Sequence, residues 1–132
     1  MIETCHQRTS SFIIATVLLL GMLSGAPGCR TSSAKSITPA QLDAMKTAPD
    51  VVIIDVREPA ELGSLPSVAG ARNIPLGTLA SHLSELDKQK RYVLGCRSGN
   101  RSSKAAELME RNGFTKIYSL DGGMQAYSQH QK

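Results

Sequence analysis

Short runs of apolar residues alternate along this chain with segments whose apolar positions recur at helical spacing. Val51–Ile54 is a continuous run rich in β-branched residues, Tyr92–Leu94 is a second run, and Lys116–Leu120 is expected to form a further strand. A short continuous apolar run is typical of a strand covered on both faces, as in a parallel sheet. Arg72–Ile74 is predicted to add a brief edge strand.

Helices are predicted between these strands. Thr38 is expected to cap a helix that begins at Pro39 and runs to about Lys46, and Ser102 or Ser103 is expected to cap a later one. The other signals are the spaced residues Leu79, Leu83 and Leu86, the inner-face residues Ala105, Leu108 and Met109 with the stop Asn112-Gly113, and the segment Met124–His130 after the turn Asp121–Gly123. Strands alternating with helices over short links predict an α/β sandwich.

The chain has 132 residues, 41% of them hydrophobic, which suits one domain. We expect a linker at 29–36 and the folded domain at 37–132. The net charge of +4 includes no charge run with interleaved aromatic residues, so nucleic-acid binding is not expected. His6, His82 and His130 share no ligand spacing, and we expect neither a metal nor a cofactor.

Residues 1–28 have the order of an export signal. Arg8 precedes the apolar run Phe12–Leu23, and the small residues Ser24–Gly28 follow it. This run of twelve residues is shorter than the roughly 17–25 that a membrane-spanning helix needs. Removal of the signal is therefore favoured, with an uncleaved N-terminal anchor as the alternative.

Ala26–Cys29 resembles a bacterial lipobox, in which the cysteine is lipidated and becomes the new N-terminus. The resemblance implies an exported, membrane-anchored lipoprotein that faces the periplasm or the cell exterior. Arg30 follows the cysteine, which resembles the outer-membrane default of Gram-negative lipoproteins. The alternative is that Cys29 is an incidental residue of the leader.

Cys96 is then the one free thiol of the folded part, because processing at Cys29 removes Cys5 and lipidation uses Cys29. It lies after a predicted strand and before a predicted helix N-terminus, where open α/β sheets bind ligands. Unpaired N–H groups there, with Arg97 and Arg101, favour a thiolate and an anionic substrate. The alternative is a buried, inert cysteine.

Four blocks of the sequence together resemble the single-domain rhodaneses. Cys96–Arg101 matches the active loop C-R-x-G-x-R, Asp55–Glu58 matches D-V-R-E, Ala71–Leu76 matches the block ending in N-I-P-L, and Leu120–Met124 matches L-x-G-G-x. The blocks occur in the same order and spacing as in that family and cover roughly residues 36–128. The resemblance implies a three-layer α/β/α sandwich around a mainly parallel sheet.

The same resemblance implies a sulfurtransferase of the thiosulfate type. The Cys96 thiolate takes the outer sulfur of thiosulfate or a related anionic donor, and the persulfide passes that sulfur to cyanide, a thiol or a protein acceptor. The residues implied to bind the donor and the persulfide are Arg97, Ser98, Gly99, Asn100, Arg101 and Ser102.

The chain departs from the usual pattern at three places that bear on the pocket rim and on substrate preference. Ser67–Ala71 replaces H-I-P-G-A, so the common histidine is absent. Gly95 precedes the cysteine where an aromatic residue is common, and Tyr127 stands where tryptophan is frequent.

Two other functions remain alternatives. Cysteine phosphatases and arsenate reductases of related fold use a C-x5-R loop, whereas Cys96 to Arg101 is C-x4-R, so they are less favoured. A persulfide carrier, or a module that binds partners without free-substrate turnover, also fits.

Four charged residues near the first strand are expected to be structural. Asp55 and Arg57 are predicted to fix a loop. Glu58 and Glu61 are expected to be solvated surface carboxylates.

Overall fold

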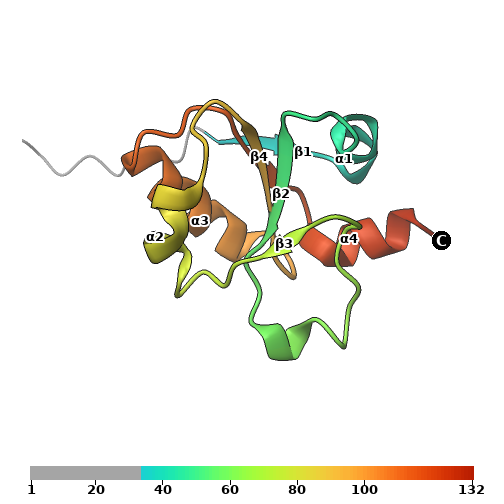
Figure 1. Cartoon of the computed structure of the whole chain (residues 1–132). Helices are drawn as coiled ribbons and strands as arrows, with labels where there is room; N and C mark the ends of the chain where they lie inside the picture. The colour runs from blue at the N-terminus through green and yellow to red at the C-terminus, as the bar shows by residue number, and fades with distance from the viewer. Residues whose placement is uncertain (1–33) are drawn as a thin grey trace, which may run out of the picture.

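The computed structural model describes residues 34–132 and shows one five-stranded sheet with helices on both faces (Figure 1). The strand order is β1-β5-β4-β2-β3, and every pair of neighbours is parallel. The strands are β1 (Lys35–Ile37), β2 (Val51–Asp55), β3 (Arg72–Asn73), β4 (Arg91–Gly95) and β5 (Ile117–Leu120). The helices are α1 (Pro39–Met45), η1 (Pro59–Glu61), α2 (Leu79–His82), η2 (Leu83–Glu85), α3 (Asn100–Arg111) and α4 (Gly123–His130). The predicted α/β class is confirmed.

Each face of the sheet has its own buried cluster. Ile54 and Leu94 pack with α2, η2 and α3 on one face, whereas Ile53 and Val93 pack with α1 and α4 on the other. Successive side chains of a strand point to opposite faces, so a strand buried on both sides needs an unbroken apolar run. The runs found in the sequence therefore belong to β2 and β4, two of the three interior strands of the sheet.

Several boundaries follow local signals. Thr38 caps α1, where its backbone N–H also donates to the side chain of Gln41. Asn112 ends α3, and Gly113 follows with a φ of 87°. Both boundaries confirm predictions made from residue type.

Three expectations need correction. Lys35 and Ser36, assigned to the linker, form β1 with Ile37, because the backbone there pairs with β5. The segment of spaced leucines is two short elements, α2 and η2, rather than one helix. Neither Ser102 nor Ser103 caps α3: the N-cap residue is Gly99 in the left-handed conformation, and the helix begins at Asn100.

The predicted signal, the start of the linker and Cys29 lie outside the described residues. Within residues 34–132, none of the helices has both the length and the apolar character needed to span a bilayer.

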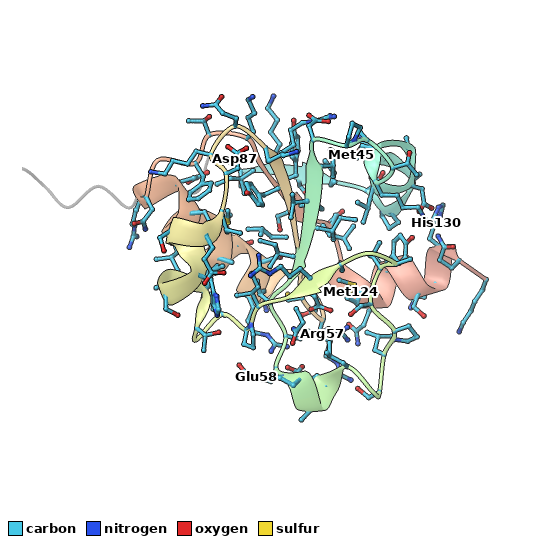
Figure 2. All side chains as sticks on the ribbon, in the orientation of Figure 1. Met45, Arg57, Glu58, Asp87, Met124 and His130 are labelled. Carbon is cyan, nitrogen blue, oxygen red and sulfur yellow. The ribbon has the colours of Figure 1, made fainter. Side chains whose placement is uncertain are left out.

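Because all neighbouring strands are parallel, their N-terminal ends lie on one side of the sheet and their C-terminal ends lie together on the opposite side. Figure 2 labels Arg57 and Glu58, which follow β2, at the end of the molecule opposite Asp87 and Met45. Cys96 follows β4, the neighbour of β2, so its loop belongs to the same end as Arg57 and Glu58. This is the end of a parallel sheet at which ligands bind.

Candidate active site

The thiol of Cys96 is buried at the start of the turn that connects β4 to α3. The residue is 1% exposed, and the preceding carbonyl of Gly95 accepts a hydrogen bond of 2.8 Å from the N–H of Val56. Among residues 34–132 Cys96 is the one cysteine, and it is not in a disulfide. Cys96 is thus buried, although the residues that follow it are polar, because those residues form the turn above the sulfur.

Hydrogen-bond donors converge on this sulfur. The N–H of Gly99 donates to Sγ over 3.0 Å, and the Ser102 hydroxyl oxygen lies 3.8 Å from it. Burial alone would raise the pKa of the Cys96 thiol. The N–H groups of Ser102, Gly99 and Ser98 and the Ser102 hydroxyl outweigh burial, so the pKa lies below its ordinary value. The site therefore favours a thiolate, as expected.

The turn depends on a glycine and a buried serine. Gly99 has a φ of 107°, which a residue with a side chain adopts only under strain, and this conformation aims its N–H at the sulfur. Ser102 is fully buried; its hydroxyl donates to the Gly99 carbonyl over 2.7 Å and lies 2.8 Å from the Ser119 hydroxyl. Ser102 therefore links the turn, the sulfur and β5.

The N-terminus of α4 also stabilises this turn, through hydrogen bonds to its backbone carbonyl groups. The N–H of Met124 donates to the Cys96 carbonyl over 2.7 Å, and the N–H of Gln125 donates to the Arg97 carbonyl over 3.1 Å. Gly123 has a φ of 60°, and a Cβ there would lie 2.7 Å from the Arg97 carbonyl oxygen. The Leu120–Met124 block therefore packs against the backbone of the active loop and holds it in place.

Two departures from the family pattern have structural accounts. A Cβ at Gly95 would lie 2.5 Å from Cε of the buried Met124, so the glycine leaves room for that methionine. Tyr127 donates its hydroxyl to Asp43 over 2.8 Å and so ties α4 to α1.

The two arginines of the loop have different surroundings. Arg97 is exposed and makes no side-chain hydrogen bond or ion pair with the rest of residues 34–132 in the structure. Arg101 directs both terminal nitrogens at Glu61, with distances of 2.5 Å and 2.7 Å. Glu61 was expected to be a solvated surface group, and that expectation is wrong. Neither arginine is among the groups that lower the Cys96 pKa most, which are amides and a hydroxyl.

Asp55 and Arg57, which are predicted to fix a loop, form a buried ion pair. Arg57 donates to both carboxylate oxygens of Asp55, with a shortest distance of 2.7 Å, and also to the Leu65 carbonyl and the Ser67 hydroxyl. Ser67 donates in turn to Asp55. Ser67 begins the segment that replaces the family's histidine block, and here its hydroxyl completes the network that fixes the 58–68 loop.

The remaining predicted residues, Ser98 and Asn100, are exposed on the side of the loop toward β1 and β5. With Gly99 they line a cavity of about 330 Å³, whose lining also includes Ser119 and Asp121. The described residues include no cluster of histidine, cysteine and carboxylates that would hold a metal.

Sequence reasoning missed the contacts of Glu61 and Ser119. Glu61 is forty residues from Arg101 and sits in a loop, so no periodicity connects them. The sequence did contain one indication of this pair. Glu61 shortly follows one predicted strand, and Arg101 lies in the loop that follows another. Ser119 lies in β5 next to the buried Leu120, and residue type alone did not indicate that its hydroxyl lies 2.8 Å from that of Ser102.

The fold and this loop define a class of protein. A model of the family described as Rhodanese-like domain matches residues 38–130, so the chain belongs to that family.

Individual relatives agree with the family match. The chain is 41% identical over 75 residues to the uncharacterized protein YqhL of Bacillus subtilis, a match that covers 57% of this chain and 59% of YqhL. It is 31% identical over 93 residues to the thiosulfate sulfurtransferase GlpE of Stutzerimonas stutzeri, covering 70% of this chain and 84% of GlpE. A rhodanese-related protein of Thermoplasma volcanium has a similar structure, with a TM-score of 0.66 and 34% identity over 73% of this chain and 92% of that one.

Proposed function

We propose that this protein is a sulfurtransferase that carries sulfane sulfur as a persulfide on Cys96. With thiosulfate as donor, the Cys96 thiolate attacks the outer sulfur, a new S–S bond forms, and the old S–S bond breaks with its electron pair leaving on sulfite. The persulfide anion then gives its terminal sulfur to cyanide as thiocyanate, or to a thiol as a new persulfide. Each transfer restores the thiolate.

The observation that carries the proposal is the set of donors around the Cys96 sulfur. The Gly99 N–H points at Sγ over 3.0 Å, and the Ser98 and Ser102 amides also lower the thiol pKa. A persulfide keeps a negative charge close to the same position, so donors that stabilise the thiolate can also stabilise the intermediate. Such fixed donors require no rearrangement during the reaction.

Thiosulfate is the proposed donor on two grounds. GlpE, a relative at 31% identity, is named a thiosulfate sulfurtransferase. The exposed Arg97, which directly follows Cys96 in the chain, also provides a cation in the active loop that an anionic donor can contact.

The main competing activity is that of a cysteine phosphatase, which the loop length disfavours. Inserting one glycine after Ser98 converts C-x4-R into C-x5-R and moves Arg101 relative to the sulfur. We expect the insertion to abolish thiosulfate turnover and to permit weak phosphate-ester hydrolysis. Unchanged sulfur transfer would show that loop length does not set the chemistry.

The test of the reaction is sulfite release without an acceptor. The parent is expected to release about one equivalent of sulfite per chain in a burst, because the persulfide has no outlet, and Cys96→Ser is expected to release none. Addition of cyanide then distinguishes an enzyme from a dedicated carrier. An enzyme turns over continuously, whereas a persulfide carrier to one protein retains its sulfur.

We further propose that the chain is exported and held at a membrane by lipid on Cys29. The proposal rests on the sequence order of Arg8, the apolar run Phe12–Leu23 and the lipobox-like Ala26–Cys29.

A further inference from the structure

The contact between Glu61 and Arg101 bears on which donor the site accepts. The two side chains form a bidentate ion pair with distances of 2.5 Å and 2.7 Å, and they are 26% and 32% exposed. The two terminal nitrogens of a guanidinium form a fork that binds a planar or tetrahedral oxyanion, and a carboxylate in that fork uses N–H groups that a sulfonate could otherwise use. Glu61 therefore occupies an anion position of the active loop.

Glu61 is held in this place by its own segment. Its carboxylate also accepts a hydrogen bond of 3.0 Å from the N–H of Glu58, across the short helix η1 that begins at Pro59. The hydrogen bonds from Arg101 and from the Glu58 N–H lower the pKa of Glu61 to about 2. The carboxylate consequently stays ionised throughout the pH range in which a sulfurtransferase is assayed.

The pair changes the charge that a donor meets. Arg97 and Arg101 contribute two positive charges to the loop, and Glu61 cancels one of them within hydrogen-bond distance. The exposed Glu58 is a second carboxylate close enough to act on Arg101. A donor that binds the two terminal nitrogens of Arg101 in the same way must displace Glu61, whereas any other donor meets an arginine whose charge Glu61 already balances.

We propose that Glu61 is a specificity-determining residue, which competes with the donor for Arg101 and thereby weakens the preference of the site for donors with two negative charges over donors with one. The inference rests on the proposed sulfur transfer and goes further by naming the donor class. Repulsion from the Cys96 thiolate and from Glu61 acts on each charge of the donor. A dianion therefore loses more than a monoanion when Glu61 is present.

Two small donors isolate this effect. Thiosulfate carries two negative charges, and methanethiosulfonate replaces one of its oxyanions by a methyl group while keeping the transferable sulfur. With thiosulfate the Cys96 thiolate yields persulfide and sulfite. With methanethiosulfonate it yields persulfide and methanesulfinate, so the same bonds form and break in both reactions.

The experiment compares kcat/KM for the two donors in the parent and in Glu61→Gln. The glutamine keeps the length and one acceptor oxygen but removes the charge. We expect the ratio of kcat/KM for thiosulfate over methanethiosulfonate to rise roughly two- to fivefold, the range for a partly exposed ion pair. Glu58→Gln is the matched control: it removes the same charge outside the Arg101 fork, and we expect it to change the ratio less.

An unchanged or lower ratio in Glu61→Gln overturns the proposal, since Glu61 would then merely hold Arg101 in position for the donor. An equal rise in Glu58→Gln also overturns it, because a general field and not occupation of the fork would be responsible. Calorimetric binding of thiosulfate in a Cys96→Ser background is the second readout and needs no turnover. Tighter binding when Glu61→Gln is added supports the proposal, and equal or absent binding contradicts it. Loss of the proposed function is recognised separately, as failure of the parent to turn over either donor.

Discussion

Replacing Ser102 by alanine tests whether amides and a hydroxyl, rather than the loop arginines, set the reactivity of Cys96. The hydroxyl oxygen lies 3.8 Å from Sγ and donates to the Gly99 carbonyl in the resting arrangement. When the thiol ionises, this proton can turn toward the sulfur, while the Ser119 hydroxyl at 2.8 Å donates to Ser102. Ser102 can thus transfer its one hydrogen bond from the Gly99 carbonyl to the thiolate.

The size of the effect follows from that contact. A hydrogen bond to a charged group contributes about 1.5–3 kcal/mol, and the long distance to sulfur places this one at the lower end. At about 1.4 kcal/mol per unit, Ser102→Ala is expected to raise the Cys96 pKa by about one unit. It also removes one donor to the Gly99 carbonyl, which keeps the Ser103 N–H over 3.2 Å, so the free energy of unfolding is expected to fall by about 0.5–1.5 kcal/mol, the net contribution of one hydrogen bond.

The assay is the pH dependence of iodoacetamide alkylation, followed on the Cys96 peptide by mass spectrometry so that Cys5 and Cys29 do not contribute. Ser103→Ala is the matched control, because Ser103 is exposed and has no contact with the sulfur among the described residues. An unchanged pKa in Ser102→Ala would refute the reasoning. So would a larger rise in Arg101→Ala, which would make charge the dominant factor.

Three further predictions concern the contact of Gly123 with the active loop, stability in acid and the N-terminus. Gly123→Ala forces a side chain into a φ of 60° against the loop backbone, so the free energy of unfolding should fall by about 1–3 kcal/mol in a denaturant titration and Cys96 alkylation should slow. Gly77→Ala, with open space around it, is the control, and equal effects would contradict the account. The pKa of Glu61 is lowered from 4.5 to about 2 in the folded protein, so the ionised carboxylate stabilises the fold fully above pH 4.5 and loses this contribution as the pH falls toward 2. In acid titrations, the free energy of unfolding of Glu61→Gln should therefore fall less steeply with pH than that of the parent. An equally steep fall would exclude this contribution. Cys29→Ser should prevent lipid modification and membrane-fraction retention, and continued retention would indicate an uncleaved anchor.

The central part of the fold could be predicted from the sequence because burial on both faces leaves a direct mark. The apolar runs at Val51–Ile54 and Tyr92–Leu94 belong to β2 and β4, which lie inside the sheet. β1 gave no such mark: Ile37 is its one buried residue, and the strand forms through backbone pairing with β5. Edge strands held mainly by backbone hydrogen bonds leave little pattern in side-chain type.

The candidate site divides in the same way. The position of Cys96 after a strand and before a helix follows from local order along the chain. The start of α3 was misplaced because the left-handed conformation of Gly99 replaces a side-chain cap. The Glu61–Arg101 pair depends on how the loop after β2 folds over the loop after β4, which is a tertiary contact across forty residues. Residue types suggested that charges meet at this end of the sheet, but not which charges pair.

The central claim is that Cys96 carries sulfur, and mass spectrometry of the protein after incubation with thiosulfate tests it most directly. The sample is digested without reductant, and Cys96→Ser is treated in parallel. The account predicts that the Cys96 peptide gains the mass of one sulfur atom and that brief treatment with cyanide removes it with formation of thiocyanate. An unmodified Cys96 peptide in protein that has consumed thiosulfate, or added sulfur on another residue, would contradict the account.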